Sequence, residues 1–483
     1  MDFRVVAVFK QWPIYFIGRI LPAGIAFFGI ALYTRFLDPG TFGIYALLLS
    51  TSFLVGTTCF AWLRVATLRM SGTIDPAEEP DYAATILVAY AGMSLLTAAV
   101  IVAVIRISQP QVSWTAVALT AGTAIASGWF ELNVTACQSR LRLIAYSALQ
   151  AARAAGTLAG SLLLIYAGLR VNALLGGFII GNLLGFGAIG VWKPALRGRV
   201  RHAMVARLWR FGWPSSVVSL SSFSATFQNF LLQSAVGSAA LGVFAVATSF
   251  ATQSVALLMG TASLAGQPLA FRARDNGTHE QLIAQLRSNA RLVFAIGLGS
   301  TAGLIALAGP LVNVYLGPRF RADGVMLVTI SALAVFVGGM RTAYFEQAFE
   351  IAFHTRPIAV VQTVRVVINV VLALVAIHFY GVLGAVAAFL TTELIVLTLT
   401  VVWSRRHLRM PIPLASYAKV VAASAIMIGV VQLVPGRDHL TGLVLAVVVG
   451  VAVYGLSFGV LYHRTLTALV RVRWPSLLGA ARP

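Results

Sequence analysis

Long apolar runs alternate with short polar breaks along the whole chain. A membrane-spanning helix needs about 20 consecutive apolar residues, and fourteen stretches of the chain meet that requirement. They lie at 12–36, 42–64, 82–106, 113–137, 144–168, 171–192, 212–235, 239–263, 290–315, 323–349, 358–378, 380–403, 416–434 and 440–462. The pattern therefore predicts an all-α polytopic membrane protein with about fourteen transmembrane helices.

The most basic polar break lies near the middle of the chain. It carries six basic residues and no acidic residue: Lys193, Arg197, Arg199, Arg201, Arg207 and Arg210. Short loops rich in Lys and Arg remain in the cytoplasm. With both termini inside, 23 Lys and Arg residues fall on the cytoplasmic side of the predicted spans and 6 fall outside. We therefore predict that both termini are cytoplasmic.

The segments before and after this break resemble each other. Three short motifs recur in the same order at offsets of 201, 199 and 214 residues: Trp12-Pro13 with Trp213-Pro214, Phe42-Gly43 with Leu241-Gly242, and Arg142 to Ala145 with Arg356 to Ala359. Because each half has six spans, the repeat is parallel, and a site is expected between the halves. The predicted division is an N-lobe (1–193), a basic linker (194–211), a C-lobe (212–404), and two C-terminal helices with a basic tail (405–483).

Composition narrows the function. The chain is 59% hydrophobic and 10% charged, against about 25% charged residues in a soluble domain. The formal charge of +21 is scattered between apolar segments, which favours anionic membrane lipid and an anionic substrate over nucleic acid. Cys59 and Cys137 lie inside apolar stretches and indicate neither disulfides nor a metal site. No phosphate-binding loop and no nucleophile–base motif is present, so we expect no cofactor, no metal and no enzymatic activity.

Four motifs carry a resemblance to a known family. They are Ala31 to Ser50 (ALYTRFLDPGTFGIYALLLS), Leu208 to Pro214 (LWRFGWP), Gly309 to Gly317 (GPLVNVYLG), and Asn369 followed by Tyr380 to Ala385 (YGVLGA). Together they resemble bacterial polysaccharide and O-antigen flippases of the multidrug/oligosaccharidyl-lipid/polysaccharide exporter superfamily. Gln228 and Asn229 stand where many relatives carry a charged pair, so a charge-based mechanism is not carried over to that helix.

The resemblance implies two six-helix lobes around a central cavity and two additional C-terminal helices. It also implies transfer of a polyprenyl-pyrophosphate-linked oligosaccharide from the inner to the outer leaflet of a bacterial inner membrane. The expected context is lipopolysaccharide or exopolysaccharide synthesis, with a polymerase and chain-length proteins as partners.

Four arginines inside the predicted spans are candidate substrate-binding residues: Arg19, Arg153, Arg341 and Arg365. A charge at the centre of a spanning helix costs about 2.5–3.5 kcal/mol, so such residues usually face a cavity or a partner. All four lie about 10–14 Å from the cytoplasmic end of their helix, at 1.5 Å per residue. Guanidinium groups bind phosphate oxygens in a bidentate manner, which suits a pyrophosphate entering from the inner leaflet.

Each candidate has an alternative role. Arg19 and Arg365 could extend toward the interface. Two hairpins could be held by structural ion pairs, Glu131 with Arg153 and Glu346 with Arg365. Arg19 and Arg341 lack such an obvious partner, so they are the leading phosphate-binding candidates. Glu393 could pair with Arg341 or act as a protonatable coupling site.

Gln228 and Asn229 could bind sugar hydroxyls or join neighbouring helices by hydrogen bonds.

Three functions fit the chain. The first is the lipid-linked oligosaccharide flippase. The second is an ion-coupled drug or cation antiporter of the same superfamily, which would use acidic cavity residues. The third is a membrane polymerase or ligase, which would normally need a sizeable outward loop.

Overall fold

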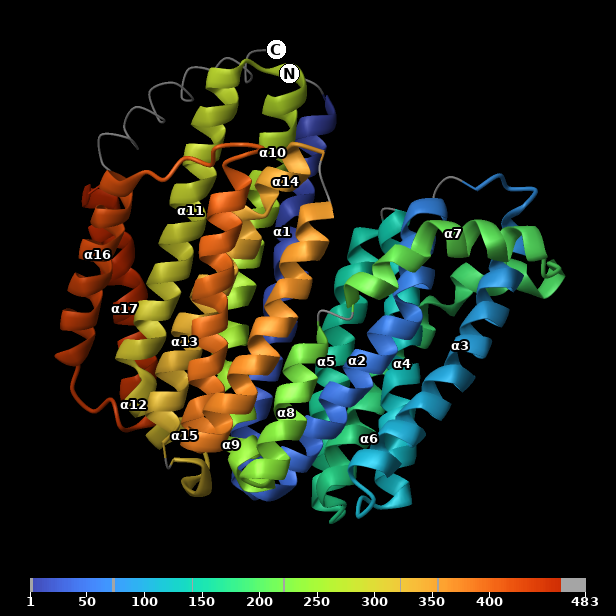
Figure 1. The fold of residues 1–483 in the computed structure, drawn as a ribbon, viewed down its shortest axis with the longest axis horizontal. Helices are drawn as coiled ribbons and strands as arrows, with labels where there is room; N and C mark the ends of the chain where they lie inside the picture. The colour runs from blue at the N-terminus through green and yellow to red at the C-terminus, as the bar shows by residue number, and fades with distance from the viewer. Residues whose placement is uncertain are drawn as a thin grey trace. The chain divides into compact units, whose positions relative to one another are not determined.

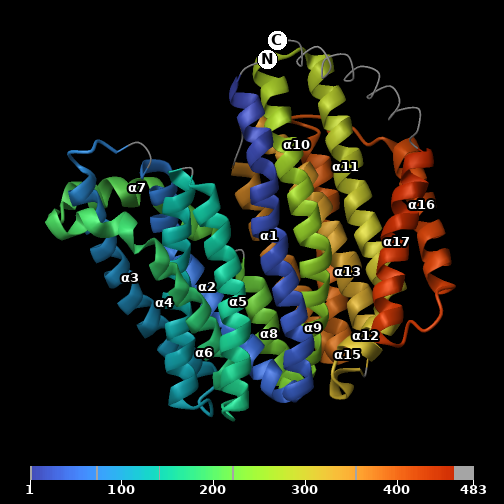
Figure 2. The same ribbon diagram turned by 180° about the vertical axis from the view of Figure 1, so that it is seen from behind.

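The protein is described by a computed structural model that covers residues 3–71, 74–140, 142–219, 222–321, 323–353 and 356–461. Within these residues the chain forms helices and no β-strand (Figures 1 and 2), so the predicted all-α class is confirmed. The chain divides into two compact units. Unit 1 comprises Met1–Val246 and Ala359–Thr392, and unit 2 comprises Ala247–Ile358 and Glu393–Pro483.

Unit 1 contains the N-terminal helices and the middle of one later helix. Its helices are α1 (Phe3–Phe36), α2 (Pro39–Met70), α3 (Glu79–Ser108), α4 (Trp114–Ser139), α5 (Leu143–Tyr166), α6 (Arg170–Leu183), a 3-10 helix (Leu184–Arg197), α7 (His202–Ser219), α8 (Phe223–Ala235), the first part of α9 (Ser238–Ala251) and the central part of α15 (Arg356–Ser404). Aromatic and aliphatic residues of α2, α3, α4 and α7 form a continuous core in this unit.

Unit 2 contains the end of α9, a π-helical turn (Thr252–Ala256) and the helices that follow. These are α10 (Leu257–Asn276), α11 (His279–Ala306), α12 (Ala308–Tyr315), a short 3-10 turn (Pro318–Phe320), α13 (Gly324–Met340), a second π-helical turn (Arg341–Phe345), α14 (Gln347–Ile351), both ends of α15, α16 (Leu414–Gln432) and α17 (Leu440–Leu461). In unit 2, α11, α16 and α17 pack on one another.

Each of the fourteen predicted spans falls on helical chain, although not every span is one helix. In the described part, ten helices are long and apolar enough to cross a membrane. One of them, α15, joins two predicted spans across Gly381, whose φ of 55° and ψ of −128° interrupt the helix. Such a backbone conformation is essentially confined to glycine. The number of crossings and the cytoplasmic termini stay predictions.

The predicted span 212–235 needs correction, whereas the predicted linker 194–211 stays a prediction. The described residues of this span belong to two separate helices, α7, which ends at Ser219, and α8, which begins at Phe223. Conversely, most of the predicted linker is helical, because the 3-10 helix ends at Arg197 and α7 begins at His202. Hydropathy averages over neighbouring residues, so it does not register a change of direction between two helices. The predicted lobes were defined by the repeat in the sequence and not by how the helices pack. They therefore stay a prediction.

The recurring glycine motifs meet at one helix crossing inside unit 1. A Cβ atom on Gly43 would lie 1.8 Å from the Ser238 carbonyl oxygen, and one on Gly242 would lie 2.0 Å from the Pro39 carbonyl oxygen. Only glycine permits backbones to approach this closely. Beside the crossing, Asp38 caps α2 by accepting a 2.9 Å hydrogen bond from the Thr41 amide. The start of α2 and the start of α9 are thereby fixed against each other.

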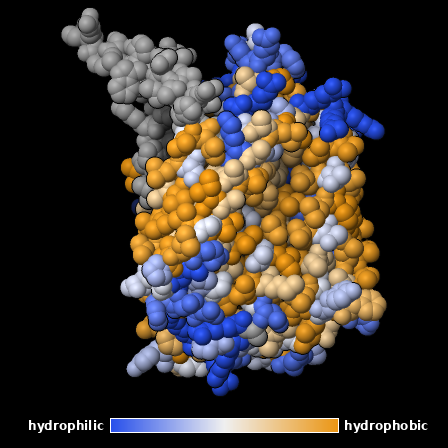
Figure 3. Space-filling model, turned by 90° about the vertical axis from the view of Figure 1, so that its left-hand side faces the viewer, coloured by the Kyte–Doolittle hydropathy of each residue, from blue (hydrophilic) through white to orange (hydrophobic). Residues whose placement is uncertain are grey.

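Many large apolar side chains face outward. On α17 they include Val444, Val448, Val451, Leu456 and Val460. Hydrophobic residues also cover much of the face seen in Figure 3. Exposed apolar area on this scale is unfavourable in water and is expected for helices that contact lipid. The protein is therefore a multi-pass membrane protein.

Candidate functional site

Unit 1 contains an open cavity that is lined by residues of four helices, α1, α2, α4 and α5. Its larger part has a volume of about 420 Å³ and is lined mainly by polar and charged side chains, together with Val65, Leu68 and Val134 and with Gly18 and Pro22 of α1. An adjoining part of about 160 Å³ has mainly apolar walls. Both parts are lined by the same three charged residues, Arg64, Glu131 and Arg153, which therefore stand at the junction between them.

The hairpin of α4 and α5 brings Glu131 and Arg153 together. Glu131 lies eight residues before the end of α4 at Ser139, and Arg153 lies ten residues after the start of α5 at Leu143. The short connection makes the two helices antiparallel neighbours, so both side chains come to a similar height. A Cβ atom on Gly181 of α6 would lie 2.6 Å from the Arg153 carbonyl oxygen. This glycine allows α6 to hold α5 in place.

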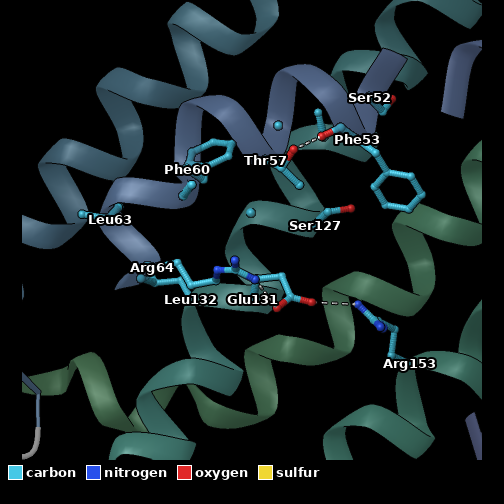
Figure 4. A pocket seen from close by; sticks show the side chains of 14 residues that line it. Ser52, Phe53, Thr57, Phe60, Leu63, Arg64, Ser127, Glu131, Leu132 and Arg153 are labelled. Atoms are coloured by element: carbon cyan, nitrogen blue, oxygen red, sulfur yellow. Dashed lines mark hydrogen bonds and ion pairs between the residues drawn. The ribbon is translucent and has the colours of Figure 1, made fainter. Parts of the chain in front are cut away.

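Glu131 contacts two guanidinium groups, which come from different helices. Arg153 donates through Nη1 to Glu131 Oε1 at 3.3 Å, and Arg64 Nη1 of α2 lies 3.8 Å from Oε2 (Figure 4). The side chains are 28% (Arg153), 38% (Glu131) and 48% (Arg64) exposed. The Arg153 guanidinium also lies 4.4 Å from the centre of the Phe130 ring, a favourable cation–π position. Two cations and one anion leave this cluster with a net positive charge.

The surroundings of the cluster differ on its two sides. Toward the C-terminal end of α2, the cavity is lined by Thr135, Gln138, Tyr146 and Gln150. These side chains supply hydroxyl and amide groups that both donate and accept hydrogen bonds. Toward the start of α2, the lining residues are mainly Phe53, Gly56, Phe60, Ala61 and Leu132, as Figure 4 shows in part. The cluster thus separates a polar region from an apolar one.

A second charged cluster is buried in unit 2. Arg341 contacts Glu346 through Nη1 and donates through Nε to Glu393 Oε2 at 3.1 Å. Arg341 is 3% exposed, Glu346 is 7% exposed and Glu393 is 2% exposed. The π-helical turn places the Glu346 amide 2.8 Å from the Arg341 carbonyl oxygen, and Gly338 leaves room for Glu393, whose Oε2 would lie 3.0 Å from a Cβ there. The cluster is closed on all sides, unlike the cavity of unit 1.

These placements revise the sequence-based expectations for Arg341. The premise that Arg341 lacks an acidic partner is wrong, because it contacts two carboxylates. The placement favours the alternative in which Glu393 pairs with Arg341. Glu346 belongs to unit 2 and Arg365 to unit 1, so their pairing as a copy of the Glu131–Arg153 contact stays a prediction.

The remaining predicted residues occupy other positions. Arg19 lies in α1 between Gly18 and Pro22, which line the cavity, but its side chain is outside the described part. Gln228 is buried and donates to the Ala385 carbonyl oxygen at 2.7 Å, which joins α8 to α15. Asn229 and Arg365 are half-buried on α8 and α15. Neither these two nor Gln228 lines the described cavity.

Sequence analysis did not select Arg64 as a site residue. The apolar stretch ends at Arg64, which places this residue among the cytoplasmic charges by sequence pattern, yet α2 continues to Met70. The additional turns place Arg64 inside the helix, facing Glu131. Arg64 and Arg69 lie at and just after the end of the apolar run, and both belong to α2. Their spacing was the signal in the sequence that the helix extends beyond its apolar run. Among described residues, no group of His, Cys, Asp and Glu side chains is arranged to hold a metal ion.

Comparisons with known proteins add a family and a fold. A family model described as "Polysaccharide biosynthesis protein" matches residues 32–323. No curated protein matches the sequence. The solved structure of the lipid II flippase MurJ, in an inward closed conformation, matches with a TM-score of 0.76 at 13% identity, covering 95% of this chain and 100% of that one. An inward-facing multidrug resistance MATE family transporter of the MOP superfamily matches with a TM-score of 0.59 at 18% identity. The match covers 81% of this chain and 97% of that one.

Proposed function

The chain belongs to the polysaccharide biosynthesis protein family, and we propose that it flips a polyprenyl-pyrophosphate-linked oligosaccharide from the inner to the outer leaflet of the bacterial cytoplasmic membrane. The predicted membership of the flippase and exporter superfamily is confirmed, and the similarity of the fold to those of a lipid II flippase and a MATE family transporter supports a role in transport. Transport would proceed by alternating access. Substrate and direction are the proposal.

The net positive cluster in the cavity is the observation that supports this function most directly. Arg64 and Arg153 approach the same carboxylate from two helices, at 3.8 and 3.3 Å. A pyrophosphate carries several oxygens that can accept from two guanidinium groups at once. Because the arginine side chains are partly exposed to the cavity, they can reach a ligand without first leaving a buried site. Glu131 holds them in place until the substrate binds.

The two regions beside the cluster suit the other parts of such a substrate. Thr135, Gln138, Tyr146 and Gln150 can exchange hydrogen bonds with sugar hydroxyls. The apolar region around Phe53 and Phe60 can receive the first isoprenoid units. A molecule that joins an oligosaccharide, a diphosphate and a hydrocarbon chain therefore finds matching chemistry in the same order along the cavity.

Arg19 remains a proposed contact to the diphosphate, because Gly18 and Pro22 on either side of it line the cavity. For Arg341 we propose a structural role, since a guanidinium that is held by two carboxylates and 3% exposed has no surface left for a substrate. Arg365, Gln228 and Asn229 are proposed as secondary contacts only.

Translocation of a lipid-linked oligosaccharide by the purified protein in proteoliposomes tests this function. Arg64→Gln and Arg153→Gln should each reduce the initial rate at least tenfold, because a charge-assisted contact to phosphate is lost. Arg140→Gln is the matched control. Arg140 pairs with Glu79 at 2.7 Å but does not line the cavity, so its rate should stay within twofold of wild type. Equal rates in all four proteins would remove the cluster from the mechanism.

A second candidate is an ion-coupled antiporter of drugs or cations. It rests on Glu131, the one acidic residue among the described residues lining the cavity, and on the MATE-like fold. Drug efflux driven by a proton or sodium gradient in the same vesicles distinguishes the two. Efflux that disappears in Glu131→Gln, together with no oligosaccharide transfer by wild type, would establish the antiporter and refute the flippase.

A further inference from the structure

Helix α7 differs from its neighbours in direction and in surface. In both ribbon views it runs across the direction of α2 and α3 rather than along them (Figures 1 and 2). Met204 and Leu208 are buried in the core of unit 1, one helical turn apart. On its other sides, Trp209, Phe211 and Trp213 are about half exposed. A helix with one face in the protein and exposed aromatic residues elsewhere is typical of the membrane–water interface.

Two contacts fix α7 at the C-terminal end of α2. A Cβ atom on Gly212 would lie 2.1 Å from the Trp62 carbonyl oxygen, so the two backbones touch. The rings of Trp62 and Trp209 meet edge to face with centroids 5.1 Å apart. Before α7, Arg201 pairs with Asp81 at 2.6 Å. These contacts hold α7 against α2 and the segment before it against α3.

A basic pocket lies where α7 meets the end of α2. It has a volume of about 520 Å³ and is lined by Arg69 and Met70 of α2 with Arg207, Arg210 and Phe211 of α7. None of these described lining residues is acidic. Three of the five lining residues are arginines, and Met70 and Phe211 contribute apolar side chains to the wall. Because α2 ends at Met70, the pocket lies at the end of a predicted membrane span.

We propose that this pocket binds the phosphate headgroup of an anionic phospholipid of the cytoplasmic leaflet. Arginine binds phosphate oxygens in a bidentate manner, and basic residues at the end of a spanning helix attract anionic lipid. The apolar wall and the exposed aromatic residues of α7 accommodate the glycerol backbone and the upper acyl chains. A free phosphate ion would contact the arginines but not the apolar wall. A phospholipid would contact both, so the proposal is a lipid and not a free ion. The site is separate from the cavity and does not depend on the transported substrate.

Binding is measured on the full-length protein in neutral detergent, with dioctanoyl phosphatidylglycerol as the probe and dioctanoyl phosphatidylcholine as the neutral lipid. Native mass spectrometry counts bound lipid, and a titration gives the affinity. Wild type should bind phosphatidylglycerol at least tenfold more tightly than phosphatidylcholine. Arg207→Gln with Arg210→Gln should weaken phosphatidylglycerol binding on the order of 30-fold, from about fivefold for each basic residue.

The matched control removes two charges from the same polar segment outside the pocket. Arg197→Gln with Arg199→Gln changes the net charge equally, and both side chains are exposed and absent from the described lining. Its affinity should remain within about twofold of wild type. Equal weakening in the two double variants would mean general electrostatic attraction and would overturn the proposed site. Competition by glycerol 3-phosphate as strong as that by the lipid would also overturn it.

Folding of the variants is checked by their melting temperatures without added lipid. Arg207→Lys with Arg210→Lys provides a second line of evidence, because lysine keeps the charge but loses the bidentate geometry. It should show an affinity between those of wild type and the glutamine variant. Wild-type affinity in the glutamine variant refutes the proposal whatever the lysine variant shows.

Discussion

Replacing Arg341 with glutamine tests whether the buried charge cluster stabilises unit 2. Glutamine keeps part of the side-chain volume and can still donate hydrogen bonds, but it removes the positive charge. Glu346 and Glu393 then lose the guanidinium that they both contact. All three residues are at least nine-tenths buried, so water cannot replace the lost interaction.

The expected loss follows from this burial. Removing one partner of a buried ion pair costs about 3–5 kcal/mol, because an uncompensated charge remains in a medium of low dielectric constant. For a unit of about 150–250 residues, 1 kcal/mol changes the melting temperature by about 2–4 °C. Arg341→Gln should therefore lower the apparent melting temperature by at least about 6 °C. Replacing Glu346 and Glu393 with glutamine in the same protein should restore part of the loss.

Thermal unfolding of the purified protein in detergent provides the measurement, with Arg140→Gln as the control. Arg140 forms a 2.7 Å pair with Glu79, but the two side chains are 23% and 29% exposed. Exposed pairs contribute about 0.2–1 kcal/mol, so the control should lose about 4 °C or less. If Arg341→Gln loses no more than Arg140→Gln, the cluster does not stabilise the unit, and Arg341 returns to the group of substrate contacts.

Three further predictions concern other parts of the chain. Glu131→Gln should lower the free energy of unfolding by only about 0.2–1 kcal/mol, because its ion pairs are partly exposed. It should also tighten pyrophosphate binding in calorimetry, because Glu131 competes with phosphate for Arg64 and Arg153. Weaker binding would contradict this competition. Gly43→Ala should lower the yield of folded protein, since overpacking costs about 1–3 kcal/mol and its Cβ meets a carbonyl oxygen at 1.8 Å. Gly92→Ala, which has open space, should show wild-type yield, and similar yields for both would argue against the crossing. With Cys59 and Cys137 replaced, a cysteine at Ala203 should be protected from an impermeant thiol reagent in whole cells and one at Arg319 should react; the reverse pattern would place the termini outside.

Several features of the protein were determined by the sequence alone. Runs of about 20 apolar residues can satisfy their backbone hydrogen bonds in lipid only as helices or in a closed barrel, so hydropathy was sufficient to predict the all-α class and the positions of the helical stretches. The contact between Glu131 and Arg153 was also accessible, because a short connection makes α4 and α5 neighbours and residue counting from the turn gives their relative height. Both the helical class and the Glu131–Arg153 contact follow from the geometry of segments that are close together in the sequence.

Other features depended on contacts between segments distant in the sequence. Arg64 joins Glu131 only because α2 packs beside α4, and Glu393 reaches Arg341 across 52 residues. The recurring Gly43 and Gly242 motifs were visible in the sequence, but nothing in it indicated that they lie at the same crossing. Hydropathy reports how strongly a segment avoids water and not which segment it meets. Close packing and charge pairing across helices select those partners, and they become apparent only in the tertiary structure.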